Sequence, residues 1–127
     1  MTHRKLTLAA QGIAAMLLLM AATMKLIGDP ASVEVFVRLH MEPAGRNMIA
    51  VIELVAALLM LSPFAALGSL IAVAVMCGAI IAHVTQLGLV VNNDGGLLVG
   101  MLVVVLLCAG YVLVSRRKEI PFIGSTL

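Results

Sequence analysis

Three ionisable residues, Lys25, Glu53 and His83, lie inside stretches of sequence that are otherwise apolar, each on a different stretch. A charged side chain in the hydrocarbon of a membrane costs about 2.5–3.5 kcal/mol on insertion scales, so such groups usually face the interior of a helical bundle and mark function. A carboxyl group beside an imidazole can pass protons near neutral pH. We therefore expect Glu53 and His83 to act as a catalytic, proton-handling pair, with Lys25 as a binding residue that supplies positive charge.

Two further polar residues are predicted to share these faces. Arg46 precedes Glu53 by two helical turns, and Gln86 follows His83 at i+3. At about 1.5 Å per helical residue, Glu53 and His83 each lie roughly 10 Å inside the outer ends of their segments. We expect the five side chains to converge on one pocket near the outer leaflet, with Arg46 and Gln86 as binding residues.

A structural role for the same residues remains open. Glu53 would then form an ion pair with Lys25 or Arg46 that ties helices together, and His83 would hydrogen-bond to that pair. A metal site needs three or four ligands, and Glu53, His83 and Asp94 make a poor set. We predict no metal site.

Composition indicates a membrane protein. Of the 127 residues, 63% are apolar and 11% are charged, and the mean hydropathy is +1.20. A helix needs about 20 residues to cross the hydrocarbon of a bilayer, and a soluble bundle would show a polar face on every helix. The sequence therefore predicts one integral membrane domain over residues 1–127. We expect an all-α, antiparallel four-transmembrane-helix bundle with spans at about 6–27, 46–62, 64–90 and 96–114.

The positions of the basic residues predict the orientation. The net charge of +2 is too small to indicate a nucleic-acid partner. Basic residues gather instead at 3–5 and 116–118. Short cytoplasmic segments are rich in Lys and Arg, and an even number of spans puts both ends on one side. We expect an inner-membrane protein with both termini in the cytoplasm. A signal peptide over residues 1–24 is the rival interpretation, but it would leave three spans with a single basic end.

The loop outside the membrane is predicted to hold a short amphipathic helix around Ala31–Met41. Asp29 would cap this helix and Pro30 would occupy its first position. The apolar residues of this segment also alternate as in a strand, but an isolated strand would leave backbone groups unpaired near lipid. The helix should cover the pocket and screen it from water.

Turns and small residues predict which helices are neighbours. Tight turns are expected at Ser62-Pro63 and at Asn92–Gly96. Pairs of small residues four positions apart let helices approach closely. We expect them to pack within the monomer, and a subunit interface is the alternative. These pairs are Gly68/Ala72, Gly78/Ala82 and Gly96/Gly100.

Three segments resemble the DoxX-like family of small four-helix membrane proteins. They are Ala22-Thr23-Met24-Lys25-Leu26, residues 47–54 with Glu53, and residues 78–83 with His83. The resemblance covers about residues 5–115, with Asn47 standing where the family often has a hydrophobic residue. It implies an antiparallel four-helix bundle. It also implies a link to membrane redox processes, since relatives include a subunit of a thiosulfate:quinone oxidoreductase and members of oxidative-stress complexes.

Several functions fit these residues. The first is a redox-associated subunit that exchanges protons with a quinone or with a partner oxidoreductase. The near absence of aromatic side chains, with no Trp and one Tyr, weakens a stacking site for a quinone. The alternatives are a non-catalytic accessory or assembly protein, a cofactor-free isomerase or hydrolase for a lipophilic substrate, and a small proton-coupled exporter. The partners we expect are the lipid bilayer, a lipophilic small molecule, and a second copy of the chain or an oxidoreductase.

Overall fold

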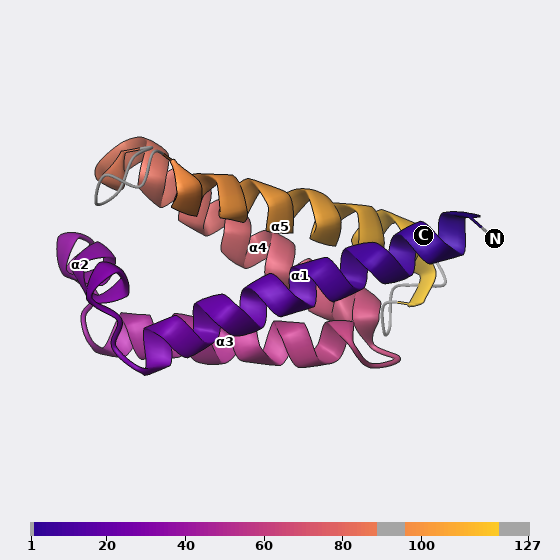
Figure 1. Cartoon of the computed structure of the whole chain (residues 1–127), viewed down its shortest axis with the longest axis horizontal. Helices are drawn as coiled ribbons and strands as arrows, with labels where there is room; N and C mark the ends of the chain where they lie inside the picture. The colour runs from indigo at the N-terminus through magenta and orange to yellow at the C-terminus, as the bar shows by residue number, and fades with distance from the viewer. Residues whose placement is uncertain (1, 89–95, 120–127) are drawn as a thin grey trace.

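The computed structural model describes residues 2–88 and 96–119, and this part of the chain is helical without a β-strand (Figure 1). Three segments, His3–Leu26, Ala65–Leu87 and Leu97–Ser115, are long and apolar enough to cross a membrane. The prediction of an all-α fold is confirmed for these residues, and the three apolar helices indicate an integral membrane protein. The elements are α1 (Thr2–Leu26), α2 (Pro30–Arg38), α3 (Ala44–Met60), α4 (Ala65–Ala82), a π-helix η1 (His83–Leu87), α5 (Leu97–Ser115) and a 3₁₀ turn η2 (Arg117–Glu119).

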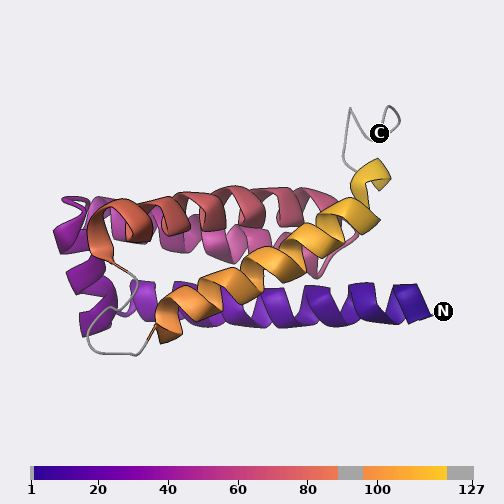
Figure 2. The same cartoon turned by 90° about the horizontal axis from the view of Figure 1, so that it is seen from above.

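Four of these helices lie side by side. α1 packs against α3 and α5, and α4 packs against the same two helices. The chain reverses its direction from each long helix to the next, so that the beginning of α1 and the end of α5 lie at one end of the molecule (Figures 1 and 2). The short helix α2 lies at the opposite end, which we call the α2 end.

The interior is built from small side chains. Ala14, Ala15, Ala56, Ala57 and Ala72 are each 0–1% exposed. Close approach of helices through small residues is typical of membrane bundles, because no hydrophobic effect drives association within lipid. The largest apolar side chains that are almost fully buried are Leu18, Met60, Met76 and Val112.

The connection from α1 to α2 follows the predicted turn chemistry. Gly28 has φ of 76°, its N–H bonds to the carbonyl of Lys25, and the N–H of Asp29 bonds to the carbonyl of Met24. This is the Schellman arrangement that ends a helix. The Asp29 carboxylate then accepts from Ser32 N, and Pro30 opens α2. The prediction of a cap and a first-position proline is confirmed.

The loop helix is shorter than predicted. It ends at Arg38 rather than near Met41, because His40 has φ of 59°. The N–H of His40 bonds to the carbonyl of Val37, and the N–H of Met41 bonds to that of Phe36, which stops the helix as at Gly28. The alternative of a strand is excluded. Val35 and Phe36 form a buried cluster with Leu87 of η1, so α2 covers the ends of the neighbouring helices.

The bounds of the other helices also differ from the predicted spans. α3 begins at Ala44 and has 17 residues, and it is not among the three segments long enough to span. The third predicted span continues through η1 to Leu87. The predicted turn at Asn92–Gly96 lies outside the described residues except for Gly96, whose φ is 88°.

One of the three small-residue pairs packs within the monomer as predicted. A Cβ atom at Gly68 would lie 2.7 Å from the Met60 nitrogen and 2.8 Å from the Ala56 oxygen, so α4 crosses the backbone of α3 here. A Cβ atom at Gly78 or Gly100 would meet nothing within 4 Å. These two glycines therefore face open space rather than a neighbouring helix of the chain.

Gly68→Ala and Gly78→Ala form a matched pair that tests this packing. Gly68→Ala should lower the free energy of unfolding by about 1–3 kcal/mol, because the new methyl group overlaps backbone atoms that cannot rotate away. Gly78→Ala should raise it by up to about 1 kcal/mol, because alanine favours the helix and meets no obstacle. Unfolding in detergent measures both, and equal effects would contradict the close contact of α3 and α4.

Candidate functional site

An ion pair between α1 and α3 lies inside the bundle. Lys25 Nζ is 2.8 Å from Glu53 Oε1, and the side chains are 18% and 2% exposed. Glu53 belongs to the buried face of α3, together with Ala50, Ala57 and Met60. The alanines on either side of it leave room for the lysine stem to reach the carboxylate. Of the two predicted partners of Glu53, Lys25 is therefore the one that forms the pair.

The lysine side chain points toward the middle of the bundle. Gln11 Nε2 donates to the Met60 carbonyl at 2.7 Å, which sets the register of α1 against α3. Counted from that bond at about 1.5 Å per residue, the Lys25 backbone lies roughly 10 Å farther toward the α2 end than the Glu53 backbone. The two long side chains span this offset by extending toward one another. Gln11 itself is not part of the site, because it bonds to α3 at the level of Met60.

Arg46 belongs to a second polar contact at the start of α3. Its Nε donates to both carboxylate oxygens of Glu42 at 2.9 Å, and its Nη2 lies 2.9 Å from Glu42 Oε1. Its Nη1 donates to the carbonyl oxygen of Lys25. The guanidinium thus joins α3 to the end of α1, where it is a second donor to the Lys25 carbonyl beside the N–H of Gly28. It does not reach Glu53.

His83 opens the π-helix and is 4% exposed. Its Nδ1 lies 2.8 Å from the Ala79 carbonyl oxygen, and because a carbonyl only accepts, Nδ1 carries the proton. Nε2 is buried and has no hydrogen-bond partner within residues 2–88 and 96–119. Nε2 is thus the ring nitrogen that is left for a further contact. π-helical turns of this kind often occur at functional sites.

Glu53 and His83 do not hydrogen-bond to each other, although we expected them to act as a pair in one pocket. Gly68 of α4 lies opposite Ala56 and Met60 of α3, which gives a common level on the two helices. Counted from that level toward the α2 end, Glu53 is about five residues away along α3 and His83 is about fifteen residues away along α4. The two backbones are then roughly 15 Å apart along the bundle. The helix bounds give the reason: His83 lies four residues from the end of η1, whereas Glu53 lies nine residues inside α3.

Gln86 is exposed, although we expected it on the buried face of His83. The segment from His83 to Leu87 is π-helical, and its wider turn brings Leu87, rather than Gln86, to the buried side. The structure thus brings Lys25 and Glu53 together, places Arg46 beside the Lys25 carbonyl, and leaves His83 and Gln86 apart from both.

Glu42 is the polar partner that the sequence reasoning missed. Its spacing to Arg46 is i,i+4, which favours an ion pair on a helix, and this was the available signal. Pro43 between the two residues obscured that signal, because it made the segment look like a loop.

No candidate metal centre occurs in the described ranges. They contain no group of three or more His, Cys, Asp or Glu side chains placed to hold an ion. Asp94 lies outside the described residues. Among the predicted site residues, the groups placed for acid–base chemistry are the paired carboxylate of Glu53 and Nε2 of His83.

Comparison of the chain with protein-family models, with curated proteins and with solved structures gives no match.

A double-mutant cycle on Lys25 and Glu53 tests whether the ion pair is energetically coupled. Lys25→Met should cost about 3 kcal/mol or more, because it leaves a carboxylate that is almost fully buried without its countercharge. Glu53→Leu should cost less, because the lysine head can swing out to water. The double variant should be more stable than Lys25→Met alone. Additive losses in detergent unfolding would show that the two groups do not interact.

Proposed function

We propose that this chain is an inner-membrane protein that folds as an antiparallel four-transmembrane-helix bundle. In this proposal it serves a membrane redox process, and Glu53 exchanges a proton with a quinone or with a partner oxidoreductase. The buried ion pair between Lys25 and Glu53 is the observation that carries the proposal.

The outer surface of α3 supports four spans rather than three. Its outward residues are apolar and strongly exposed, where a soluble bundle would carry polar side chains. They are Met48 (56%), Val51 (51%), Val55 (43%) and Leu58 (55%). At about 1.5 Å per residue, α3 is roughly 25 Å long, so it needs its flanks or local thinning of the bilayer to cross.

The chemistry of the ion pair suits proton exchange. A proton arriving at Glu53 removes the countercharge of Lys25. Lys25 is the last residue but one of α1, so its head can then turn outward to water. Protonation of Glu53 is thereby linked to a movement of a cation at the α2 end. Intramembrane carboxylates with such a partner are typical of proton relays.

His83 offers a second proton-accepting group nearer the α2 end. His83 stands at the start of η1, and its Nε2 has no hydrogen-bond partner among the described residues. In the proposal His83 passes protons between the membrane surface and the level of Glu53 through water, rather than by a direct contact. The resemblance to DoxX-like proteins, which rests on Lys25, Glu53 and His83, adds the association with redox partners.

A non-catalytic accessory protein is the second candidate. The observation that favours it is that both polar contacts hold two helices together, which needs no chemistry. The Lys25–Glu53 pair and the contact from Arg46 to the Lys25 carbonyl each tie α1 to α3.

Infrared difference spectroscopy in nanodiscs separates the two candidates. The difference between the spectra recorded with a short-chain ubiquinone in its oxidised and in its reduced form should contain a carboxyl C=O band. Glu53→Gln should abolish this band, because the amide keeps the shape and accepts from Lys25 but cannot exchange a proton. Glu34→Gln, on the exposed face of α2, is the control and should keep it.

The outcomes are distinct. A wild-type spectrum without the band, or a band that survives Glu53→Gln, would overturn proton exchange at Glu53. A lower melting temperature of Glu53→Gln with no change in the spectrum would favour the accessory protein.

Reporter fusions test the proposed topology. A reporter enzyme that works only in the cytoplasm should be active when it is joined after Leu127, because both basic clusters are expected on that side. A reporter enzyme that works only on the outer side should be active when it is joined after Arg38. Activity of the first fusion on the outer side would refute the orientation, and two fusions on the same side would refute the four spans.

A further inference from the structure

The interior of the bundle is apolar on the side of Glu53 that faces away from α2. Leu18 follows Gln11 by seven residues and Glu53 precedes Met60 by seven, so the bond between Gln11 and Met60 puts Leu18 and Glu53 at one level. From that level to Met60, over roughly 10 Å, the remaining buried side chains of α1 and α3 are apolar and at most 1% exposed. We call them the apolar plug. They are Ala14, Ala15, Leu18, Ala56, Ala57 and Met60.

The helices α4 and α5 complete this plug. Four of their small apolar side chains belong to the same buried cluster and are 0% exposed, namely Ala65, Ala72, Ala109 and Val112. Neither α4 nor α5 contains an acidic or basic residue. An apolar region that is packed in this way stays dry, because a buried water needs polar partners. The plug therefore offers no chain of water along which a proton could move.

The polar side chains nearest to the plug do not bridge it. Gln11 Nε2 donates to the Met60 carbonyl at 2.7 Å, and the Ser69 hydroxyl donates to the Ala65 carbonyl at 2.8 Å. A backbone carbonyl accepts a hydrogen bond but has no proton to pass on. Each of these bonds therefore ends a path for protons instead of extending it toward Glu53.

On the side of α2, polar groups connect Glu53 with the surface. Lys25 Nζ lies 2.8 Å from Glu53 Oε1, and the lysine side chain is 18% exposed. Water that reaches this ammonium group is thus one contact away from the buried carboxylate. Arg46 and Glu42 follow toward the α2 end, with side chains that are 11% and 20% exposed. His83 stands at the start of η1, and its Nε2 has no partner among the described residues.

We infer that Glu53 exchanges protons only with the α2 end of the bundle, and that the apolar plug closes it to the opposite end. This inference rests on the proposed function, in which Glu53 exchanges a proton, and it adds the side from which the proton comes. A quinone or a partner protein that takes or supplies this proton must then meet the chain at the α2 end. The bundle does not conduct protons from one side of the membrane to the other.

Solid-state NMR of the full chain in sealed lipid vesicles tests this sidedness. The vesicles should hold most of the molecules in one orientation, and the glutamate carboxyl carbons are isotope-labelled, since their resonances shift on protonation. The medium is acidified while the vesicle interior stays buffered near neutral pH. Glu34, on the exposed face of α2, reports the pH at the α2 end within the same molecules. Glu34→Gln and Glu53→Gln each remove one resonance and so assign both.

The fraction of molecules in which Glu53 shifts should equal the fraction in which Glu34 shifts. A Glu53 fraction that matches the molecules with unshifted Glu34 would show access from the opposite end, and a shift in all molecules would show access from both ends. Either result would overturn the inference but leave proton exchange at Glu53 intact. If Glu53 does not shift even when both sides of the vesicle are acidified, proton exchange itself is refuted and the inference falls with it.

Discussion

The need to pair one buried carboxylate determines much of this structure. Glu53 is 2% exposed, and no charge in such a place is stable without a partner at hydrogen-bonding distance. Lys25 meets this need from α1, and the helices must approach closely for the stem to reach. Alanines at positions 50 and 57 of α3 and at 14 and 15 of α1 permit that approach. The small interior and the ion pair therefore depend on each other.

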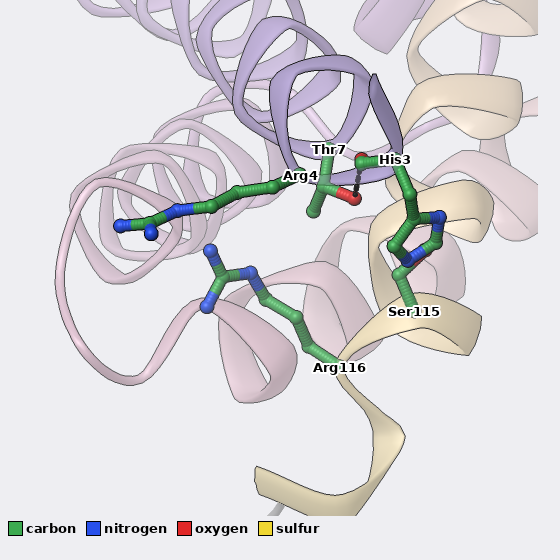
Figure 3. Close-up of a pocket in the computed structure, with 5 residues that line it drawn as sticks. All are labelled: His3, Arg4, Thr7, Ser115 and Arg116. Carbon is green, nitrogen blue, oxygen red and sulfur yellow. Dashed lines mark hydrogen bonds between the residues drawn. The ribbon is translucent and has the colours of Figure 1, made fainter. Parts of the chain in front are cut away.

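A second polar contact, made by Arg46 at the α2 end, supports the ion pair between Lys25 and Glu53. Arg46 binds both oxygens of Glu42 and also donates to the carbonyl of Lys25, so it anchors the backbone that carries the buried lysine. Gly28 turns the chain immediately after this point, and α2 then folds over the ends of the helices. The opposite end of the bundle has a different character. It gathers basic residues from both ends of the chain, and a shallow, open depression there is lined by His3, Arg4, Thr7, Ser115 and Arg116 (Figure 3).

Much of this arrangement could be predicted from the sequence, where the signals are local or concern pairing. The apolar runs predicted the helices, Asp29-Pro30 predicted the start of α2, and the cost of a charge in lipid predicted a partner for Glu53. Depth was harder to predict. Arithmetic from the ends of apolar runs put Glu53 and His83 at one level, but helices end where hydrogen bonding ends, and α3 and η1 do not end at matching distances from the two residues. The predicted position of Gln86 was wrong for a related reason, because a π-helical turn cannot be recognised from residue spacing.

The central claim is that Lys25 and Glu53 form an ion pair inside a membrane-spanning bundle. Solid-state NMR of the full chain in lipid bilayers tests it directly, through the dipolar coupling between the Lys25 side-chain nitrogen and the Glu53 carboxyl carbon. If Nζ and Oε1 are separated by about the 2.8 Å of the structure, the spectrum should show this coupling clearly. When only carboxyl carbons are labelled, the coupling should be absent in Glu53→Gln, because that variant has no carboxyl carbon at position 53. A wild-type spectrum without this coupling, and with a lysine ammonium group in rapid exchange with water, would contradict the account.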